Sequence, residues 1–158
     1  MNPLNLPSEL PIARYRLHFT LTHDLQLPSY AASTLRGVFG HALLAAACTC
    51  DTPQTPHLPD FPYAQIFEPA PCADLPSSVR QSPPPPYLIE TPLVAPTHFP
   101  AGAGYAFDLV LFGRARHSLP LIAAVFAQAF AKGLGANNAG NGELSGIAVQ
   151  QADGSFLT

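Results

Sequence analysis

Residues 27–48, LPSYAASTLRGVFGHALLAAAC, contain the histidine that is best placed to do chemistry. At the roughly 100° spacing of an α-helix, His41 projects about 140° from the apolar stripe, beside Thr34 and Cys48. We therefore predict that its imidazole is accessible to solvent, where it can act as a general acid or base near neutral pH. An ordinary surface histidine is the simpler interpretation of the same spacing.

A second group of polar residues lies in an alternating segment over residues 13–21. The apolar positions are Tyr15, Leu17, Phe19 and Leu21, and the polar positions are Arg14, Arg16, His18 and Thr20. This period of two predicts a β-strand with one buried face and one basic face. The basic face has either a functional or interfacial explanation, or it is simply solvated.

A glycine-rich loop, GLGANNAGNG, occupies residues 133–142. Glycine permits positive φ and close approach of a ligand, and such loops can present amide donors to phosphate. This loop follows the end of a predicted helix, so it matches neither a P-loop nor a dinucleotide-binding fingerprint. A flexible turn is the commoner interpretation.

The remaining periodic segments supply the elements that position these residues. The first is a helix over 29–48, whose apolar side carries Leu35, Phe39, Ala42, Leu43 and Ala46. Strands are predicted over 87–91, 105–112 and 143–150. A second helix is capped by Ser118 and stops at Lys132 and Gly133. The first helix also carries a row of small residues, Ser33, Gly37, Gly40 and Leu44, where another backbone can approach closely.

The order of these elements is β-α-loop-β-β-α-β. It predicts an α+β fold of the ferredoxin-like split βαβ type, which has a four-stranded antiparallel sheet with both helices on one face. In this topology the first strand is central. We therefore expect the basic side of residues 13–21 to lie in the middle of an uncovered sheet face.

Proline is concentrated in the middle of the chain. Of the 19 prolines in 158 residues, 14 lie between Pro53 and Pro100. Because proline lacks an N–H donor, we predict a long loop over 51–86 inside a single domain, 1–158, with neither helix nor interior strand over most of this segment. The apolar island FPYAQIF at 61–67 can dock back onto the body of the domain.

The charge balance limits the classes of function. The chain is only 11% charged, has a net charge of −3 and contains a single lysine, Lys132. This composition excludes a disordered polyelectrolyte and argues against a freestanding basic nucleic-acid-binding protein. No apolar run is long enough to span a bilayer, and the N-terminus lacks the features of a signal peptide, so we expect a cytoplasmic protein without membrane contact.

The cysteines do not form a recognisable metal motif. Cys48, Cys50, His57 and Cys72 lack the paired C-x-x-C spacing that is typical of zinc sites. We therefore expect no metal and no other cofactor, with a structural zinc ion as the less favoured alternative.

Five ordered blocks of sequence resemble a known family. They are residues 27–48, FPYAQIFEP (61–69), PPPYLIETP (84–92), FDLVLFGRARHSLPLIAAVFAQAFAKGLG (107–135) and NGELSGI (141–147). These blocks resemble the N-terminal half of the CRISPR-associated endoribonucleases that process pre-crRNA, members of the repeat-associated (RAMP) superfamily. The resemblance implies a ferredoxin-like fold, a role in antiviral defence, and binding of CRISPR repeat RNA. It also implies partnership with a second ferredoxin-like half or with other CRISPR-associated proteins.

The same resemblance implies metal-independent cleavage, in which a ribose 2′-hydroxyl attacks the adjacent phosphate. His41 is then the candidate general base or acid, and Tyr30 donates a hydrogen bond or positions the nucleophile. Arg36 offers a guanidinium fork for phosphate, with a structural role as an equal alternative. The other candidate RNA contacts are Arg14, Arg16, His18, Arg114, Arg116, His117, Gly133 and Gly135.

Two further hypotheses remain open. One is a non-catalytic RAMP-type module that binds RNA or a protein partner through its open sheet face. A small-molecule enzyme is a distant third, because the sequence shows no paired carboxylates, nucleophile elbow or strong metal cluster.

Overall fold

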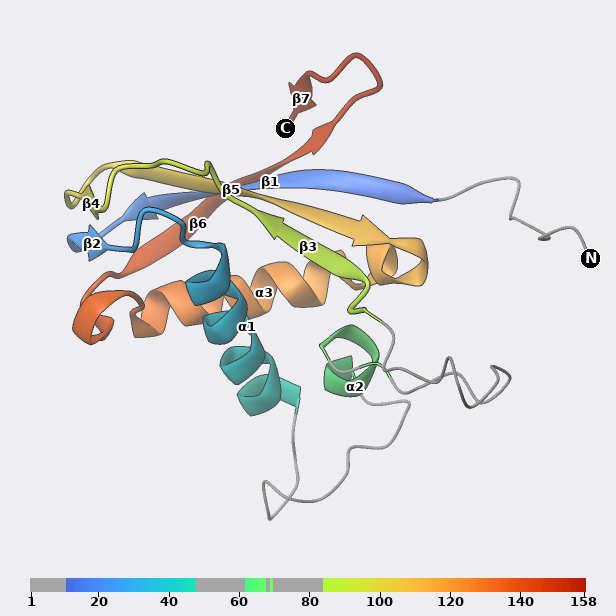
Figure 1. Cartoon of the computed structure of the whole chain (residues 1–158), viewed down its shortest axis with the longest axis horizontal. Coiled ribbons are helices and arrows are strands. Elements are labelled where there is room, and N and C mark those ends of the chain that lie inside the picture. The colour runs from blue at the N-terminus through green and yellow to red at the C-terminus, as the bar shows by residue number, and fades with distance from the viewer. Residues whose placement is uncertain (1–10, 48–61, 68, 70–83) are drawn as a thin grey trace, which may run out of the picture.

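The computed structural model describes residues 11–47, 62–67, 69 and 84–158. These residues form a mixed α+β fold with an antiparallel sheet and three α-helices (Figure 1). The strands are β1 (Ile12–Leu21), β2 (Leu25–Gln26), β3 (Tyr87–Glu90), β4 (His98–Phe99), β5 (Gly104–Phe112), β6 (Gly142–Gln150) and β7 (Phe156–Leu157). The α-helices are α1 (Ala32–Ala47), α2 (Pro62–Ile66) and α3 (Leu119–Lys132), and two 3-10 helices, η1 (Gly113–Ser118) and η2 (Ala136–Asn138), flank α3.

The first strand of the chain lies at the centre of the main sheet. The strand order is β3-β5-β1-β6-β7, while β2 and β4 form a separate two-stranded sheet. β1 pairs antiparallel with both β5 and β6, and the register places Arg16 opposite Asp108 on one side and Ala148 on the other. A register shift between His18 and Phe19 marks an irregularity in the pairing with β6.

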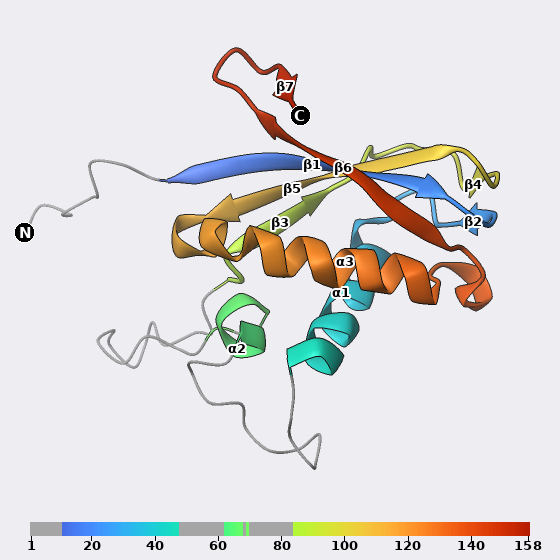
Figure 2. The same ribbon diagram turned by 180° about the vertical axis from the view of Figure 1, so that it is seen from behind.

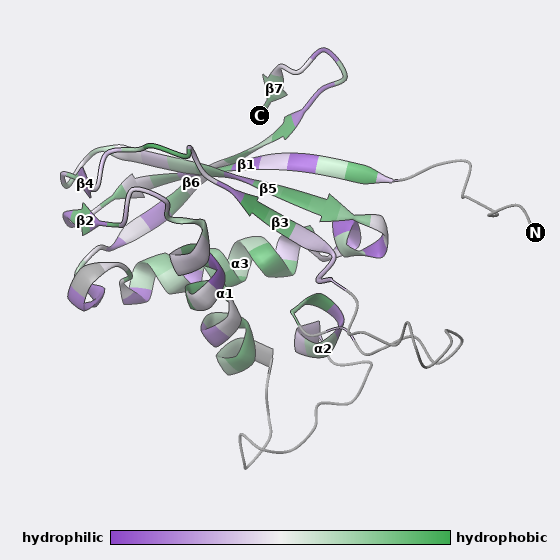
Figure 3. Cartoon of the chain, in the orientation of Figure 1, coloured by the Kyte–Doolittle hydropathy of each residue, from purple (hydrophilic) through white to green (hydrophobic). Residues whose placement is uncertain are grey.

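α1 and α3 lie on the same face of the sheet, and no helix covers the opposite face in the described part of the chain (Figures 1 and 2). The alternation along β1 explains this arrangement, because Leu17, Phe19 and Leu21 are at most 1% exposed and belong to the core. Figure 3 shows both hydrophilic and hydrophobic bands along β1. The prediction of one buried and one polar face for this strand is confirmed.

Phenylalanine rings join the sheet to the helices. Phe19 of β1 stacks on Phe130 of α3 with ring centroids 3.8 Å apart. Phe39 of α1 stacks on Phe126 of α3 at 4.9 Å, and Phe126 meets the ring of Phe107 from β5 at the same distance. All five side chains are at most 2% exposed, so these contacts form the centre of the hydrophobic core.

The apolar island predicted to dock onto the domain does so in its described residues 62–67. Ile66 is 2% exposed, and the ring of Phe67 stacks on Tyr87 of β3. The prediction of a loop over 51–86 is wrong for the short α2, which begins at Pro62. A proline is tolerated at the first position of a helix, because the N–H that it lacks has no partner within the helix. Most of the predicted loop 51–86 lies outside the described residues.

The predicted strands 13–21, 87–91, 105–112 and 143–150 are confirmed to within about two residues. The helix predicted over 29–48 begins later, at Ala32, because its first helical hydrogen bond runs from the Leu35 N–H to the Ala31 carbonyl. Ala46 was expected on the apolar side but is exposed.

The second predicted helix has its expected ends but not its expected cap. Ser118 occupies the N-cap position of α3, yet its side chain makes no capping hydrogen bond. The reason is local: η1 runs directly into α3, and the Leu119 N–H already donates to the Arg116 carbonyl. At the other end, Gly133 follows Lys132 as predicted and adopts φ 99°.

Among the described residues, no helix combines the length and the apolar character that crossing a lipid bilayer demands.

Candidate functional site

His41 lies on the exposed side of α1, as predicted. Its Nδ1 atom is 2.8 Å from the carbonyl oxygen of Gly37, one turn earlier in the helix. Because a carbonyl oxygen can only accept, Nδ1 must hold the proton and donate it. In the neutral ring this leaves the lone pair on Nε2, which is the protonation state that a general base requires.

Tyr30 and Arg36 line a common groove of about 350 Å³ between the N-terminal half of α1 and β3. Ser33, Pro84, Pro85 and Leu88 are among its other lining residues. Tyr30 is 48% exposed, so its phenol is available to a ligand. The structure therefore brings together two of the predicted site residues, and we call this hollow the α1–β3 groove.

Aromatic rings hold Arg36 in place. Its guanidinium carbon lies 4.8 Å from the ring centroid of Phe67 and 5.4 Å from that of Tyr87. Stacking on aromatic faces is a favourable arrangement for a guanidinium group. Burial raises the pKa of Tyr87 to about 12, so this phenol stays neutral beside the cation. Arg36 thus has a structural contact, while its position on the groove leaves it available to an anion.

The α1–β3 groove does not include His41. Because a helix rises about 1.5 Å per residue, His41 lies about 14 Å along the axis from Ala32 at the start of α1. Arg36 is separated from His41 by about 140° around the helix. The structure therefore does not bring Tyr30 and Arg36 to the same reacting phosphate as His41.

The basic side of β1 is charge-paired. Arg14 forms a salt bridge with Glu90 of β3 at 3.0 Å. Arg16 makes a bidentate contact with Asp108 of β5, with Nε–Oδ1 and Nη2–Oδ2 distances of 2.7 and 3.0 Å. The hydrogen bond that Arg16 donates to Asp108 also raises the pKa of Arg16. The predicted basic face is thus a face of mixed charge, which attracts phosphate less strongly than unpaired arginines do.

Two further features of this open face were not predicted. Phe156 of β7 covers Arg16, with the guanidinium carbon 4.1 Å from its ring centroid. His18 shares a hollow of about 530 Å³ with Arg16, Glu90 and Asp108. The one available signal was Asp108, the single polar residue in the segment 105–112, but only the strand register shows that it faces Arg16.

Arg114 and Arg116 lie in η1, directly before α3. Arg114 is exposed and lines a hollow of about 390 Å³ that also includes Gln65 and Pro86. Arg116 donates from Nε to the Gly113 carbonyl at 3.3 Å. Within the described residues neither arginine forms a salt bridge, so they are the cations most open to phosphate on this part of the surface.

The glycines of the loop after α3 have a structural explanation. Gly133 and Gly135 adopt φ values of 99° and 79°, which disfavour residues with a side chain. A Cβ atom on Gly133 would meet the Asn138 carbonyl, and one on Gly135 would meet the Gln26 carbonyl of β2. The loop packs against the fold through Leu134, which is 0% exposed. Binding of phosphate by this loop stays a prediction.

We expect Gly135→Ala to lower the free energy of unfolding by at least about 1–3 kcal/mol, because it imposes both positive φ and a collision with backbone. Gly37→Ala is the matched control, since a Cβ there meets nothing within 4 Å and alanine favours the helix. Urea unfolding of the two variants checks the prediction. Equal stabilities would contradict the structural explanation of the loop.

Cys48, Cys50, His57 and Cys72, the candidate zinc ligands, lie outside the described residues. A protein-family model that describes an N-terminal domain matches residues 10–157, which is nearly the whole chain. Comparison with curated proteins gave no match.

Proposed function

The chain belongs to the AF_1859_N family of N-terminal domains. We propose that it is the N-terminal half of an endoribonuclease that processes CRISPR repeat RNA. A second ferredoxin-like half, or another CRISPR-associated protein, completes the nuclease, which acts in cytoplasmic antiviral defence. Two observations support this proposal: the resemblance in five sequence blocks and the position of His41 on α1.

The arrangement of the sheet supports a ferredoxin-like split βαβ fold of the RAMP type. In the order β3-β5-β1-β6 every neighbouring pair is antiparallel. α1 follows β1 in the chain and α3 follows β5, and both helices lie on one face (Figure 1). β2, β4, α2 and β7 are additions around this framework.

The observation that carries the proposed chemistry is the contact between His41 Nδ1 and the Gly37 carbonyl. In the proposed reaction, His41 Nε2 removes the proton of a ribose 2′-hydroxyl, and the 2′-oxygen attacks the adjacent phosphorus. The bond from phosphorus to the 5′-oxygen breaks, and a general acid protonates that oxygen. The products are a 2′,3′-cyclic phosphate and a 5′-hydroxyl, so no metal ion and no external water are consumed.

We infer that Tyr30 and Arg36 bind RNA and do not act at the cleaved bond. Both residues line the α1–β3 groove. Tyr30 precedes α1 and therefore lies at least about 14 Å along the helix axis from His41, whereas Arg36 lies on another side of α1. Arg36 and Tyr30 can hold one RNA phosphate there, by charge and by a phenolic hydrogen bond. The general acid and the donor to the reacting phosphate then come from elsewhere, in keeping with a second half that completes the site.

The pairing of Arg14 and Arg16 favours one alternative function, a non-catalytic module that binds RNA or a protein partner. Such a module makes few phosphate contacts, so its affinity for RNA falls only modestly as salt is added. RNA binding without cleavage is its signature.

A cleavage assay in EDTA distinguishes these functions. The protein, together with the second half or the CRISPR-associated protein that completes the site, is incubated with a labelled transcript of the repeat from the CRISPR array of the source genome. A parallel reaction contains the same RNA with a 2′-deoxyribose at the cut position. We expect cleavage of the first RNA to a cyclic phosphate and none of the second. Binding of RNA that stays intact would favour the non-catalytic module, and cleavage of the deoxy substrate would exclude 2′-hydroxyl attack.

We expect Asp108→Asn to tighten binding of single-stranded RNA, because it frees the charge of Arg16 on the open face. One added phosphate contact steepens the slope of log K against log salt by about 0.7. Glu143→Gln is the matched control, since it changes the net charge equally on an exposed residue of β6 that pairs with no arginine of the described residues. Equal slopes for both variants would show that Arg16 does not contact RNA.

A further inference from the structure

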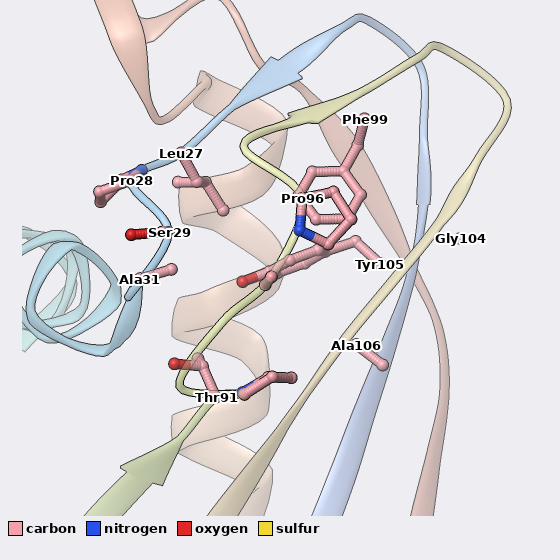
Figure 4. A pocket seen from close by; sticks show the side chains of 12 residues that line it. Leu27, Pro28, Ser29, Ala31, Thr91, Pro96, Phe99, Gly104, Tyr105 and Ala106 are labelled. Carbon is pink, nitrogen blue, oxygen red and sulfur yellow. The ribbon is translucent and has the colours of Figure 1, made fainter.

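A small pocket of about 130 Å³ lies at the edge of the main sheet, between β5 and the chain that leads into α1 (Figure 4). We call it the edge pocket. Its lining residues come from three segments: Leu27, Pro28, Ser29 and Ala31; Thr91, Pro92, Ala95 and Pro96; and Phe99, Gly104, Tyr105 and Ala106. Pro28, Ser29 and Pro96 are exposed and therefore mark its mouth.

The edge pocket exists because β3 is shorter than β5. β3 ends at Glu90 and pairs with β5 only as far as Asp108, so no described strand pairs with residues 104–107 on that side. The segment that follows β3 contains Pro92, Pro96 and Pro100. Because proline cannot donate a backbone hydrogen bond, this segment does not extend the sheet.

Two hydroxyl groups line the edge pocket and have no hydrogen-bond partner among the described residues. Tyr105 is only 8% exposed, and Figure 4 shows its side chain crossing the pocket from β5 toward Ala31 and Thr91. In the described part of the chain, no hydrogen bond reaches its phenol. Thr91 Oγ1 is buried and likewise has no hydrogen-bond partner among the described residues. Burial raises the pKa of Tyr105 to about 12, so the phenol stays protonated and can donate.

A buried hydroxyl is normally satisfied, so the unpaired Thr91 Oγ1 in the same pocket as the Tyr105 phenol points to a ligand that bonds to both. That ligand is uncharged, because no charged side chain of the described residues lines the edge pocket. Its body is apolar, because proline, leucine and phenylalanine side chains form the walls. A flat ring with hydrogen-bonding atoms at one edge meets all of these conditions.

Size narrows the choice further. An apolar cavity of roughly 150 Å³ accommodates a single benzene ring, and the edge pocket is slightly smaller at about 130 Å³. It therefore suits a pyrimidine better than the two fused rings of a purine. An apolar side chain from a protein partner fits by volume, but it leaves both hydroxyls unpaired.

We propose that the edge pocket binds one unpaired pyrimidine base of single-stranded RNA, with the hydroxyls of Tyr105 and Thr91 on the polar edge of the base. Proteins read single-stranded RNA in this way, by enclosing splayed bases and hydrogen bonding to their edges. The inference rests on the proposed function for the source of the base, while the pocket chemistry is the same for a free pyrimidine nucleoside.

The test uses the full chain with two kinds of probe. Uridine alone is titrated while amide NMR signals are followed, and labelled oligouridylate and oligoadenylate are compared by fluorescence anisotropy. We expect uridine to shift the signals of Gly104 and Ala106, and oligouridylate to bind more tightly than oligoadenylate. The uridine experiment does not depend on cleavage, so it separates failure of the pocket from failure of the nuclease.

Variants locate the binding. Tyr105→Phe and Thr91→Val each remove a hydroxyl at nearly constant shape and should weaken oligouridylate binding roughly three- to tenfold. Ala95→Phe fills the edge pocket and should weaken it at least about tenfold. Tyr15→Phe is the matched control, because Tyr15 packs against the core and does not line the pocket. Circular dichroism confirms that each variant is folded.

Three results would overturn the proposal. The first is the absence of pocket shifts with uridine. The second is that oligouridylate and oligoadenylate bind with equal affinity and that Ala95→Phe does not weaken the binding. This result would not count against RNA processing by His41. The third is loss of a protein partner, but not of uridine, in the Ala95→Phe variant, which would assign the edge pocket to an apolar side chain. If uridine binds but no RNA is cleaved, the result would support binding in the edge pocket. It would then count only against the proposed nuclease activity.

Discussion

His41→Ala should slow cleavage of the repeat RNA by about 10²–10⁴-fold, the usual contribution of a general acid or base. The variant removes the Nε2 lone pair but leaves α1 intact, because the His41 side chain is exposed and packs against no core residue. RNA affinity should therefore change little. Single-turnover kinetics with excess protein measure the cleavage step, and anisotropy measures binding of the 2′-deoxy substrate.

His23→Ala is the control for this result. His23 is also exposed, and a hydrogen bond joins its side chain to the neighbouring Thr22. We expect it to cleave like the unchanged protein. A His41→Ala protein that cleaves at the normal rate would remove this residue from the mechanism and direct the search toward the arginines of η1.

Phe39→Ala should lower the free energy of unfolding by about 3–5 kcal/mol. The ring of Phe39 is 0% exposed and contacts aromatic rings from α3, from β3 and from the residue that follows α2. It stacks on Phe126, meets Tyr87 edge-on with centroids 5.2 Å apart, and lies 6.2 Å from Phe67. Removing it opens a cavity where α1, α2, α3 and β3 meet, and the surrounding rings can fill this cavity only in part.

Chemical denaturation monitored by circular dichroism measures this loss. Leu88→Ala on β3 is the control, because Leu88 is 50% exposed and should cost less than about 1 kcal/mol. A Phe39→Ala variant as stable as Leu88→Ala would mean that the ring cluster does not hold α1 against the rest of the fold. Because Phe67 and Tyr87 also support Arg36, we expect the Phe39 variant to loosen the α1–β3 groove.

The fold was largely predictable because its main elements are strongly periodic. β1 alternates without interruption from Tyr15 to Leu21, and α3 repeats apolar residues at helical spacing until Gly133 ends it. In such segments the local sequence pattern is enough to predict the secondary structure. The short elements were missed for the opposite reason: β2, β4 and β7 contain two residues each, so they carry no pattern and depend on tertiary contacts.

The sequence predicted the position of single site residues on their own elements, but not which of these residues the fold brings together. Helical spacing correctly placed His41 on the exposed side of α1, because one element decides that question. The pairing of Arg16 with Asp108 depends on the register between two strands that are distant in sequence. The separation of Tyr30 from His41 depends on where α1 begins. The edge pocket was not predictable at all, since it lies beside the residues of β5 that the shorter β3 does not reach.

The central position of β1 also determines when the domain can fold. β1 precedes its partners in the chain, and the Arg16–Asp108 contact joins residues 92 positions apart. During synthesis β1 therefore emerges with its apolar face uncovered, and its second neighbour, β6, comes later still. Long-range pairing of this kind slows folding and prolongs the exposure of unpaired strands. We therefore expect this protein to fold slowly and to gain from chaperones until β6 has been made.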